Sequence, residues 1–373
     1  MRLVIDREQP IPVISLVTPH CHVTTIVLRL GLSILGEQAG ERGASLMLLR
    51  RICGRLLRAL CTEAATVRGS IAWAHADLVV ECLPRDAPRI VDTVASVVEG
   101  YRESVDGELG TAVRSDHQPP IRTEQLARRK LYHPEDRRSL SLTVMPIAAE
   151  GACADLAPVL RAIGVAGPAP VGLGGRFNGW LDGQADRTSA LSACRRRYRL
   201  DGGWSAQRLA RKGVWNSVAF SLPVDTDEGA RAVAIACGAF VYGPVPRLYE
   251  SFRYGAGGYG LSVRFEPTNG DVFVCFETAG SVGDRYPLAR EIRAVLDAVL
   301  HGEVSVADLR AYRVTSSAAQ QTDPYLVLSA ALVAIESNGD IDSRSVQRRA
   351  ADFASVPDCA ILDQVDAWRG LLA

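Results

Sequence analysis

Apolar residues recur between residues 44 and 60 at the spacing of an amphipathic helix. Arginines fill the positions between them, so one face of the helix is apolar and the other is basic. The apolar positions are Leu46, Leu49, Ile52, Leu56 and Leu60. The pattern predicts a helix with one buried face.

Segments rich in β-branched residues lie on both sides of this helix. Residues 12–32 predict two strands joined by a turn, and residues 70–83 predict a strand pair or one long strand. Helices are expected at 84–101 and 122–132. The Gly- and Pro-rich segment 164–185 predicts an irregular loop or linker.

A similar order of elements returns in the second half of the chain. Residues 214–224 predict a strand, and 226–242 predict a helix that Thr226 can cap. Residues 246–267 predict a short helix, a glycine-rich turn and a strand, and Asn269–Gly270 predicts a hairpin turn before the next strand. Further helices are expected at 287–300, 306–319, 325–336 and the C-terminus.

This order predicts a duplicated α+β unit, in which each domain is an antiparallel sheet covered by helices on one face. A chain of 373 residues also exceeds what one hydrophobic core usually supports. We place the two domains at 1–200 and 213–373, with the true boundary between residues 165 and 213.

The charge and cysteine content indicate which partners and which cellular compartment to expect for this protein. Forty-two basic residues balance forty-two acidic ones, which predicts neither a nucleic-acid partner nor an anionic membrane surface. The nine cysteines are scattered and form no C-x-x-C pair, which is typical of reduced thiols in a cytoplasmic protein. No apolar run approaches the length that a bilayer requires.

Few residues suggest a metal or catalytic site. His20 and His22 flank Cys21, and on a strand the two histidines would share one face, a spacing that can bind metal. A polar strand edge or turn after Pro19 is the simpler interpretation, because no other His or Cys cluster joins the run. No G-x-S-x-G motif occurs. The remaining histidines are isolated in sequence: His75, His117, His133 and His301.

Four segments occur in a characteristic order and spacing: residues 23–52, 246–263, 301–313 and 355–368. The first contains VTTIVLRLGLSILGEQAGERGASLMLLRRI and the second PRLYESFRYGAGGYGLSV. Together they resemble the pitrilysin (insulinase) family of zinc metallopeptidases, in the half-length bacterial form related to mitochondrial processing peptidase. The resemblance spans most of the chain, although the segment between Tyr198 and Val214 is shorter than the family pattern.

The resemblance implies a helix that carries H-x-x-E-H in active members, with two zinc-binding histidines and a glutamate that activates water. Here Leu46, Leu49 and Arg50 occupy those three positions. Leucine has no lone pair to give, and a protonated arginine repels Zn²⁺. The family's distal glutamate ligand would fall near Glu124, which cannot hold a metal alone. We therefore expect no catalytic residue, metal or cofactor in this chain.

The resemblance also implies a substrate-binding segment. Relatives bind the substrate backbone through an Arg and a Tyr, whose counterparts here are Arg253 and, with a one-residue shift, Tyr259. Gly257 and Gly258 lie in the turn between them and would allow a peptide backbone to come close. Members of the family also bind peptides by adding them to an exposed sheet edge. The same residues also fit a segment without a binding role, in which the arginine is on the surface, the tyrosine is packed in a strand and the glycines form an ordinary hairpin.

These expectations lead to one main hypothesis and two alternatives. The main one is a catalytically inactive, substrate-binding subunit of a heterodimeric zinc peptidase, with zinc in a pitrilysin-like partner and a small peptide as substrate, such as a natural-product leader in a bacterium. The first alternative is a non-proteolytic structural scaffold of the same fold. The second is an independent enzyme of another chemistry, which fold alone does not exclude.

Overall fold

A computed structural model describes the residues of thirteen segments: 2–6, 11–32, 44–71, 75–103, 119–132, 160–171, 202–210, 214–255, 260–267, 270–280, 287–320, 323–338 and 349–372. These form two compact units, and each unit is discontinuous in sequence. The first comprises 1–114, 145–195 and 320–347, and the second comprises 115–144, 196–319 and 348–373.

The first unit is built on a six-stranded sheet with the order β1-β2-β6-β3-β5-β4. The pairs are antiparallel except for β2 and β6, which run parallel. The strands are β1 (Arg2–Asp6), β2 (Val13–Val17), β3 (Thr24–Leu30), β4 (Ala65–Ile71), β5 (Ala76–Cys82) and β6 (Leu160–Gly167).

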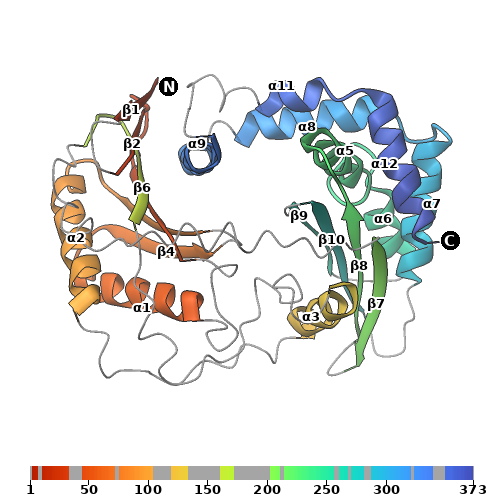
Figure 1. The fold of residues 1–373 in the computed structure, drawn as a ribbon, viewed down its shortest axis with the longest axis horizontal. Helices are drawn as coiled ribbons and strands as arrows, with labels where there is room; N and C mark the ends of the chain where they lie inside the picture. Colours follow the sequence, from red (N-terminus) through yellow and green to blue (C-terminus); the bar gives the residue numbers. More distant parts are fainter. Residues whose placement is uncertain are drawn as a thin grey trace. The chain divides into compact units, whose positions relative to one another are not determined.

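Helices cover both faces of this first sheet. On one face α1 (Ala44–Ala59) and α2 (Ala87–Glu103) bury a core that includes Ile26, Leu28 and Ile52. On the other face lies α9 (Pro324–Asn338), a segment from late in the sequence, which packs against β2, β3 and β6 (Figure 1). Burial of these apolar side chains on two faces is the main source of stability for the unit.

A buried ion pair fixes α9 to the sheet. Arg29 on β3 and Asp77 on β5 are register partners, and the Arg29 Nε and Nη2 atoms each donate a hydrogen bond to Asp77 at 2.8 Å. Ser329 of α9 accepts from Arg29 Nη2 at 3.3 Å. Both charged side chains are almost fully buried, so each one offsets the cost of burying the charge of the other.

The second unit contains a four-stranded antiparallel sheet with the order β7-β8-β10-β9. Its strands are β7 (Gly203–Ala210), β8 (Val214–Pro223), β9 (Gly260–Pro267) and β10 (Asp271–Gly280). Gly270 directly precedes β10 with φ of 97°, a backbone conformation that favours glycine.

One face of the second sheet carries the larger core, in which the rings of Phe220, Phe240 and Phe276 pack around Trp368. The Thr226 hydroxyl accepts from the Gly229 amide, as its predicted capping role requires. The helical elements of this unit's C-terminal part are α5 (Asp227–Ala236), η3 (Cys237–Ala239), α6 (Arg247–Glu250), η4 (Ser251–Gly255), α7 (Leu288–Leu300), α8 (Val306–Gln320), α11 (Arg349–Ala354) and α12 (Asp358–Gly370).

The other face of the second sheet is covered by α3 (Pro119–Leu131), which comes from the first half of the sequence (Figure 1). Ala127, Leu131 and Tyr132 pack there against Phe273 and Cys275. The Tyr132 hydroxyl donates to Asp271 at 2.9 Å and ties the C-terminal end of the helix to β10.

The α+β class and the duplicated sheet-and-helix organisation are confirmed, but several details differ from the sequence prediction. One of them is the parallel pairing of β2 with β6 in a sheet that was expected to be antiparallel. Each sheet is covered on both faces, because α3 and α9 each pack on the sheet formed by the other half of the chain. The predicted domains 1–200 and 213–373 therefore assign these two helices differently from the structure, and β7 of the second sheet falls between them. The segment expected to be a loop at 164–185 begins with the end of β6.

Candidate functional site

Helix α1 places the three positions that resemble a zinc motif. Leu49 is 1% exposed and belongs to the first core, Leu46 is half-buried, and Arg50 is exposed. Leu49 and Cys53 lie over Gly69 of β4, where an added Cβ would come within 2.9 Å of Leu49 Cγ and Cys53 Sγ. The Leu49 side chain therefore packs between the helix and the strand.

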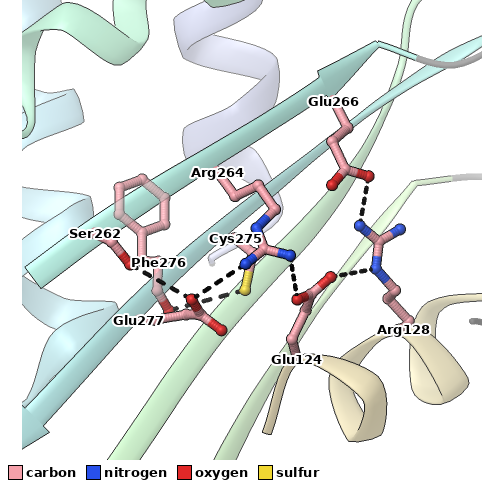
Figure 2. Close-up of polar contacts among 8 residues, drawn as sticks. All are labelled: Glu124, Arg128, Ser262, Arg264, Glu266, Cys275, Phe276 and Glu277. Carbon is pink, nitrogen blue, oxygen red and sulfur yellow. Dashed lines mark hydrogen bonds and ion pairs between the residues drawn. The ribbon is translucent and has the colours of Figure 1, made fainter. Parts of the chain in front are cut away.

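Glu124 lies on α3 in the second unit, whereas α1 belongs to the first. Its carboxylate is fully buried and accepts from Arg128 Nε at 2.7 Å and Arg264 Nη1 at 2.5 Å (Figure 2). Two guanidinium groups therefore donate hydrogen bonds to this carboxylate. This arrangement is typical of a structural ion pair rather than of a metal ligand.

Arg253 lies in the π-helical turn η4, which ends at Gly255, and β9 begins at Gly260. Its side chain is exposed, and Nη1 donates to the Tyr249 hydroxyl at 2.6 Å. The neighbouring Tyr254 is 81% exposed. Gly257, Gly258 and Tyr259, the other predicted members of this segment, lie outside the described residues.

The histidine-rich run does not form a strand face. His20 and His22 lie in the turn and bend between β2 and β3 and are exposed, while Cys21 Sγ donates to the Val23 carbonyl. His75 is half-buried beside Asp77, and desolvation together with the Arg29 charge lowers its pKa to about 4. His117 and His133 lie outside the described residues, and in the described part no three His, Cys, Asp or Glu side chains converge as a metal site.

Each sheet has two end strands in the described part of the chain, and one of them, β4 in the first sheet and β9 in the second, adjoins a helical segment. Within the described residues β4 pairs only with β5, and β9 pairs only with β10. Helix α1 packs on β4, and η4 leads into β9. An unpaired strand edge offers backbone donors and acceptors to another extended chain.

The two edge strands carry the same polar pattern, which the sequence analysis missed. Thr66 and Arg68 on β4 face Glu81 on β5, and the Thr66 hydroxyl donates to Glu81 at 3.2 Å while Arg68 donates at 2.9 Å. Ser262 on β9 likewise faces Glu277 on β10. The detectable signal is the repeated sequence Thr-Val-Arg at 66–68 and Ser-Val-Arg at 262–264, each followed by a glutamate 15 residues after its hydroxyl residue.

In the second unit this pattern joins a larger ionic network beneath α3 (Figure 2). Arg264 reaches Glu124 at 2.5 Å and Glu277 at 3.8 Å, and Arg128 connects Glu124 to Glu266. Burial raises the pKa of Glu277 to about 7, and the Glu124 charge adds to this rise while Arg264 opposes it. Glu277 therefore changes charge near neutral pH.

The sequence matches no family model and no curated protein. Solved structures are nevertheless similar over nearly the whole chain. A chain described as an M16-like peptidase from Alicyclobacillus acidocaldarius has a TM-score of 0.69 at 12% identity, covering 98% of this chain and 95% of that chain.

Two further structures are similar in fold. One is a chain of complex III2 from Candida albicans with Inz-5 bound, with a TM-score of 0.66 at 10% identity and coverage of 96% and 91%. The other is a peptidase M16 inactive domain from Pseudomonas fluorescens, with a TM-score of 0.63 at 11% identity and coverage of 99% and 94%. No described helix has both the length and the apolar character needed to cross a membrane. The chain has the pitrilysin-like α+β fold of M16-like peptidases, duplicated in two units.

Proposed function

We propose that this chain is the catalytically inactive, substrate-binding subunit of a heterodimeric zinc peptidase. A zinc-bearing pitrilysin-like subunit would supply the metal, and the substrate would be a small peptide, such as the leader of a ribosomally made natural product. One observation carries the proposal: α1 packs beside the free edge strand β4, as a zinc helix beside a substrate strand would, but presents Leu46, Leu49 and Arg50.

These residues do not fit a zinc ion. Leu46 and Leu49 have no donor atom, and Leu49 is part of the core between α1 and β4. Arg50 is exposed and stays protonated, so its charge opposes a divalent cation. We therefore derive no hydrolytic step from this chain.

Peptide binding requires none of the lost ligands. The free edges of β4 and β9 can each hydrogen-bond an extended peptide through main-chain groups. Arg253 lies just before β9, with an exposed guanidinium that can donate to a substrate carbonyl. The likeness to a peptidase M16 inactive domain supports a chain that keeps the fold without its own chemistry.

The test compares two arginine variants in the assembled complex with the zinc-bearing subunit. We expect Arg253→Ala to lower kcat/KM for the peptide by about 10- to 100-fold, the range for a lost charge-assisted hydrogen bond, with assembly intact. Arg247→Ala is the matched control, because Arg247 lies in the adjacent α6 and pairs with Glu303 on the surface. Unchanged turnover in Arg253→Ala would count against substrate binding by this segment.

A structural scaffold is the second candidate, and the similarity to a complex III2 chain favours it. A scaffold needs the fold and its assembly surfaces but no contact with a peptide. Arg253→Ala would then leave every activity of the assembly unchanged, and no zinc-bearing homologue would bind the chain.

A further inference from the structure

A row of four polar side chains crosses the second sheet on the face that α3 covers. Register pairs Gln207 with Ser217, Ser217 with Glu277, and Glu277 with Ser262, so the four side chains lie on one face, one on each strand. Ser217 is fully buried, Gln207 is half-buried and Ser262 is exposed. The row therefore crosses the whole sheet from the end strand β7 to the end strand β9, where Ser262 is exposed to solvent.

The corresponding row in the first unit is shorter, because Ala166 pairs with Thr25, and its glutamate is satisfied by residues of the same unit. Thr25 and Thr66 flank Glu81, whose two carboxylate oxygens accept from Thr66 and Arg68. Because each oxygen of Glu81 has a donor, this position has no need of another cation.

Glu277 differs because its arginine is shared. Arg264 approaches Glu124 at 2.5 Å and stays 3.8 Å from Glu277 Oε2, which the Ser262 hydroxyl reaches only at 3.4 Å. In the described part of the chain Glu277 Oε1 is buried without a hydrogen-bond partner, and so is the hydroxyl of the fully buried Ser217. Two buried polar atoms on the same row are thus available for a ligand, and a buried polar group without a partner is costly.

Charge at this position favours a cation over an anion. The charged groups around Glu277 are Glu124 and Arg128 from α3 and Arg264 from β9, with the Cys275 thiol of β10 beside them. Glu266 of β9 joins this network through its ion pair with Arg128. With Glu277 ionised, these described residues carry three carboxylates and two guanidinium groups. One additional positive charge balances the network.

We propose that Glu277, Ser217 and Ser262 form a subsite for one ammonium or guanidinium group, the side chain of a Lys or Arg in an extended peptide lying along β9. This subsite rests on the proposed peptide-binding function and adds a basic residue to the description of the substrate. A peptide residue paired with Ser262 at the free edge has its side chain on the Glu277 face of the sheet. The long stem of Lys or Arg can lean across the short serine side chain.

The test uses nine-residue acetylated peptides of strand-favouring sequence that differ only in a central Lys, Gln or Glu. We expect the Lys peptide to bind about tenfold or more tightly than the Gln peptide, in line with a charge-assisted hydrogen bond. Glu277→Gln should abolish this preference. Glu81→Gln, the equivalent change in the first sheet, should retain it because Arg68 and Thr66 already engage Glu81.

A second variant covers the case in which Glu277→Gln disturbs the sheet. Ser262 is exposed, so Ser262→Lys can place an ammonium beside Glu277 from within the chain. We expect this variant to lower the pKa of Glu277, as measured by ¹³C NMR of the carboxyl group. The variant should also lose the preference for the Lys peptide. Equal binding of the Lys and Gln peptides, or a Lys preference that survives Glu277→Gln, would overturn the subsite.

The NMR titration also separates the subsite from the wider function. Nα-acetyl-lysine amide at high concentration should lower the pKa of Glu277 even if no peptide binds. That result would support the subsite and count against peptide binding along β9. If peptides bind but neither they nor the lysine amide change the Glu277 pKa, peptide binding stands and the subsite is wrong.

Discussion

Glu81 and Glu277 occupy equivalent positions in the two sheets, each opposite a hydroxyl side chain on both neighbouring strands. The partners of Glu81 are Thr25 and Thr66, and those of Glu277 are Ser217 and Ser262. The same strand pairing and the corresponding polar rows in the two units indicate a duplicated structural unit. The two copies differ in the helix above the sheet, because α3 brings Glu124 to the second network.

The buried network should make Glu124 important for the docking of α3. We expect Glu124→Gln to lower the free energy of unfolding of the second unit by about 3–5 kcal/mol, because Arg128 and Arg264 would lose a buried partner. Hydrogen exchange of the α3 amides measures this directly, and their protection should fall.

Glu303→Gln is the control for that change. Glu303 pairs with Arg247 on the surface, where an ion pair contributes at most about 1 kcal/mol. Equal stability of the Glu124 and Glu303 variants would show that the α3 network does not hold the helix.

Leu49 should behave as a core residue. We expect Leu49→Ala to destabilise the first unit by about 2–5 kcal/mol, because it opens a cavity between α1 and β4. Arg50→Ala changes the adjacent exposed position and should stay within about 0.5 kcal/mol of the wild type. Denaturant unfolding compares the two, and a neutral Leu49→Ala would contradict the packing described here.

Glu277 should give the second unit a pH-dependent stability. Its pKa is raised from 4.5 to about 7, so the folded state holds a proton that the unfolded state has lost between these values. Stability from this group is therefore fully present below pH 4.5 and is lost as the pH rises through 7, by roughly 1–3 kcal/mol. Unfolding from pH 5 to 8 should show this slope in the wild type, and Glu277→Gln should flatten it. An unchanged slope in the variant would mean that another group causes the pH dependence of stability.

His75 should act in the opposite direction in the first unit. Burial and the Arg29 charge lower its pKa from 6.5 to about 4, so the unfolded state binds the extra proton in this range. Stability from neutral His75 is present above pH 6.5 and is lost as the pH falls toward 4. We expect His75→Gln to reduce the loss between pH 6.5 and 4, measured by thermal unfolding, and an identical loss in both proteins would contradict this assignment.

The sequence predicted the elements whose patterns are local. The spacing of apolar residues predicted α1 closely, and the Thr226 cap is present. Strand β6 was missed because its sequence, LRAIGVAG, contains two glycines and leads into a Gly- and Pro-rich segment. Its burial depends on pairing with β2 and β3, which no local pattern reveals.

The placement of α3 and α9 could not be predicted from periodicity. An amphipathic pattern indicates that a face is buried but not which sheet covers it. Glu124 therefore looked like a lost metal ligand, whereas its two arginine partners include Arg264, 140 residues later in the chain. The Glu277 row was missed for a related reason, since it is assembled from one residue on each of four strands.

The most direct test of the proposed non-catalytic role is native mass spectrometry of the chain with and without a zinc-bearing pitrilysin-like homologue from the same organism, combined with metal analysis of each species. We predict a one-to-one complex that contains one zinc ion, bound to the partner, and no zinc on the isolated chain. Zinc bound to the chain alone, or a stable homodimer that does not bind the homologue, would contradict the account.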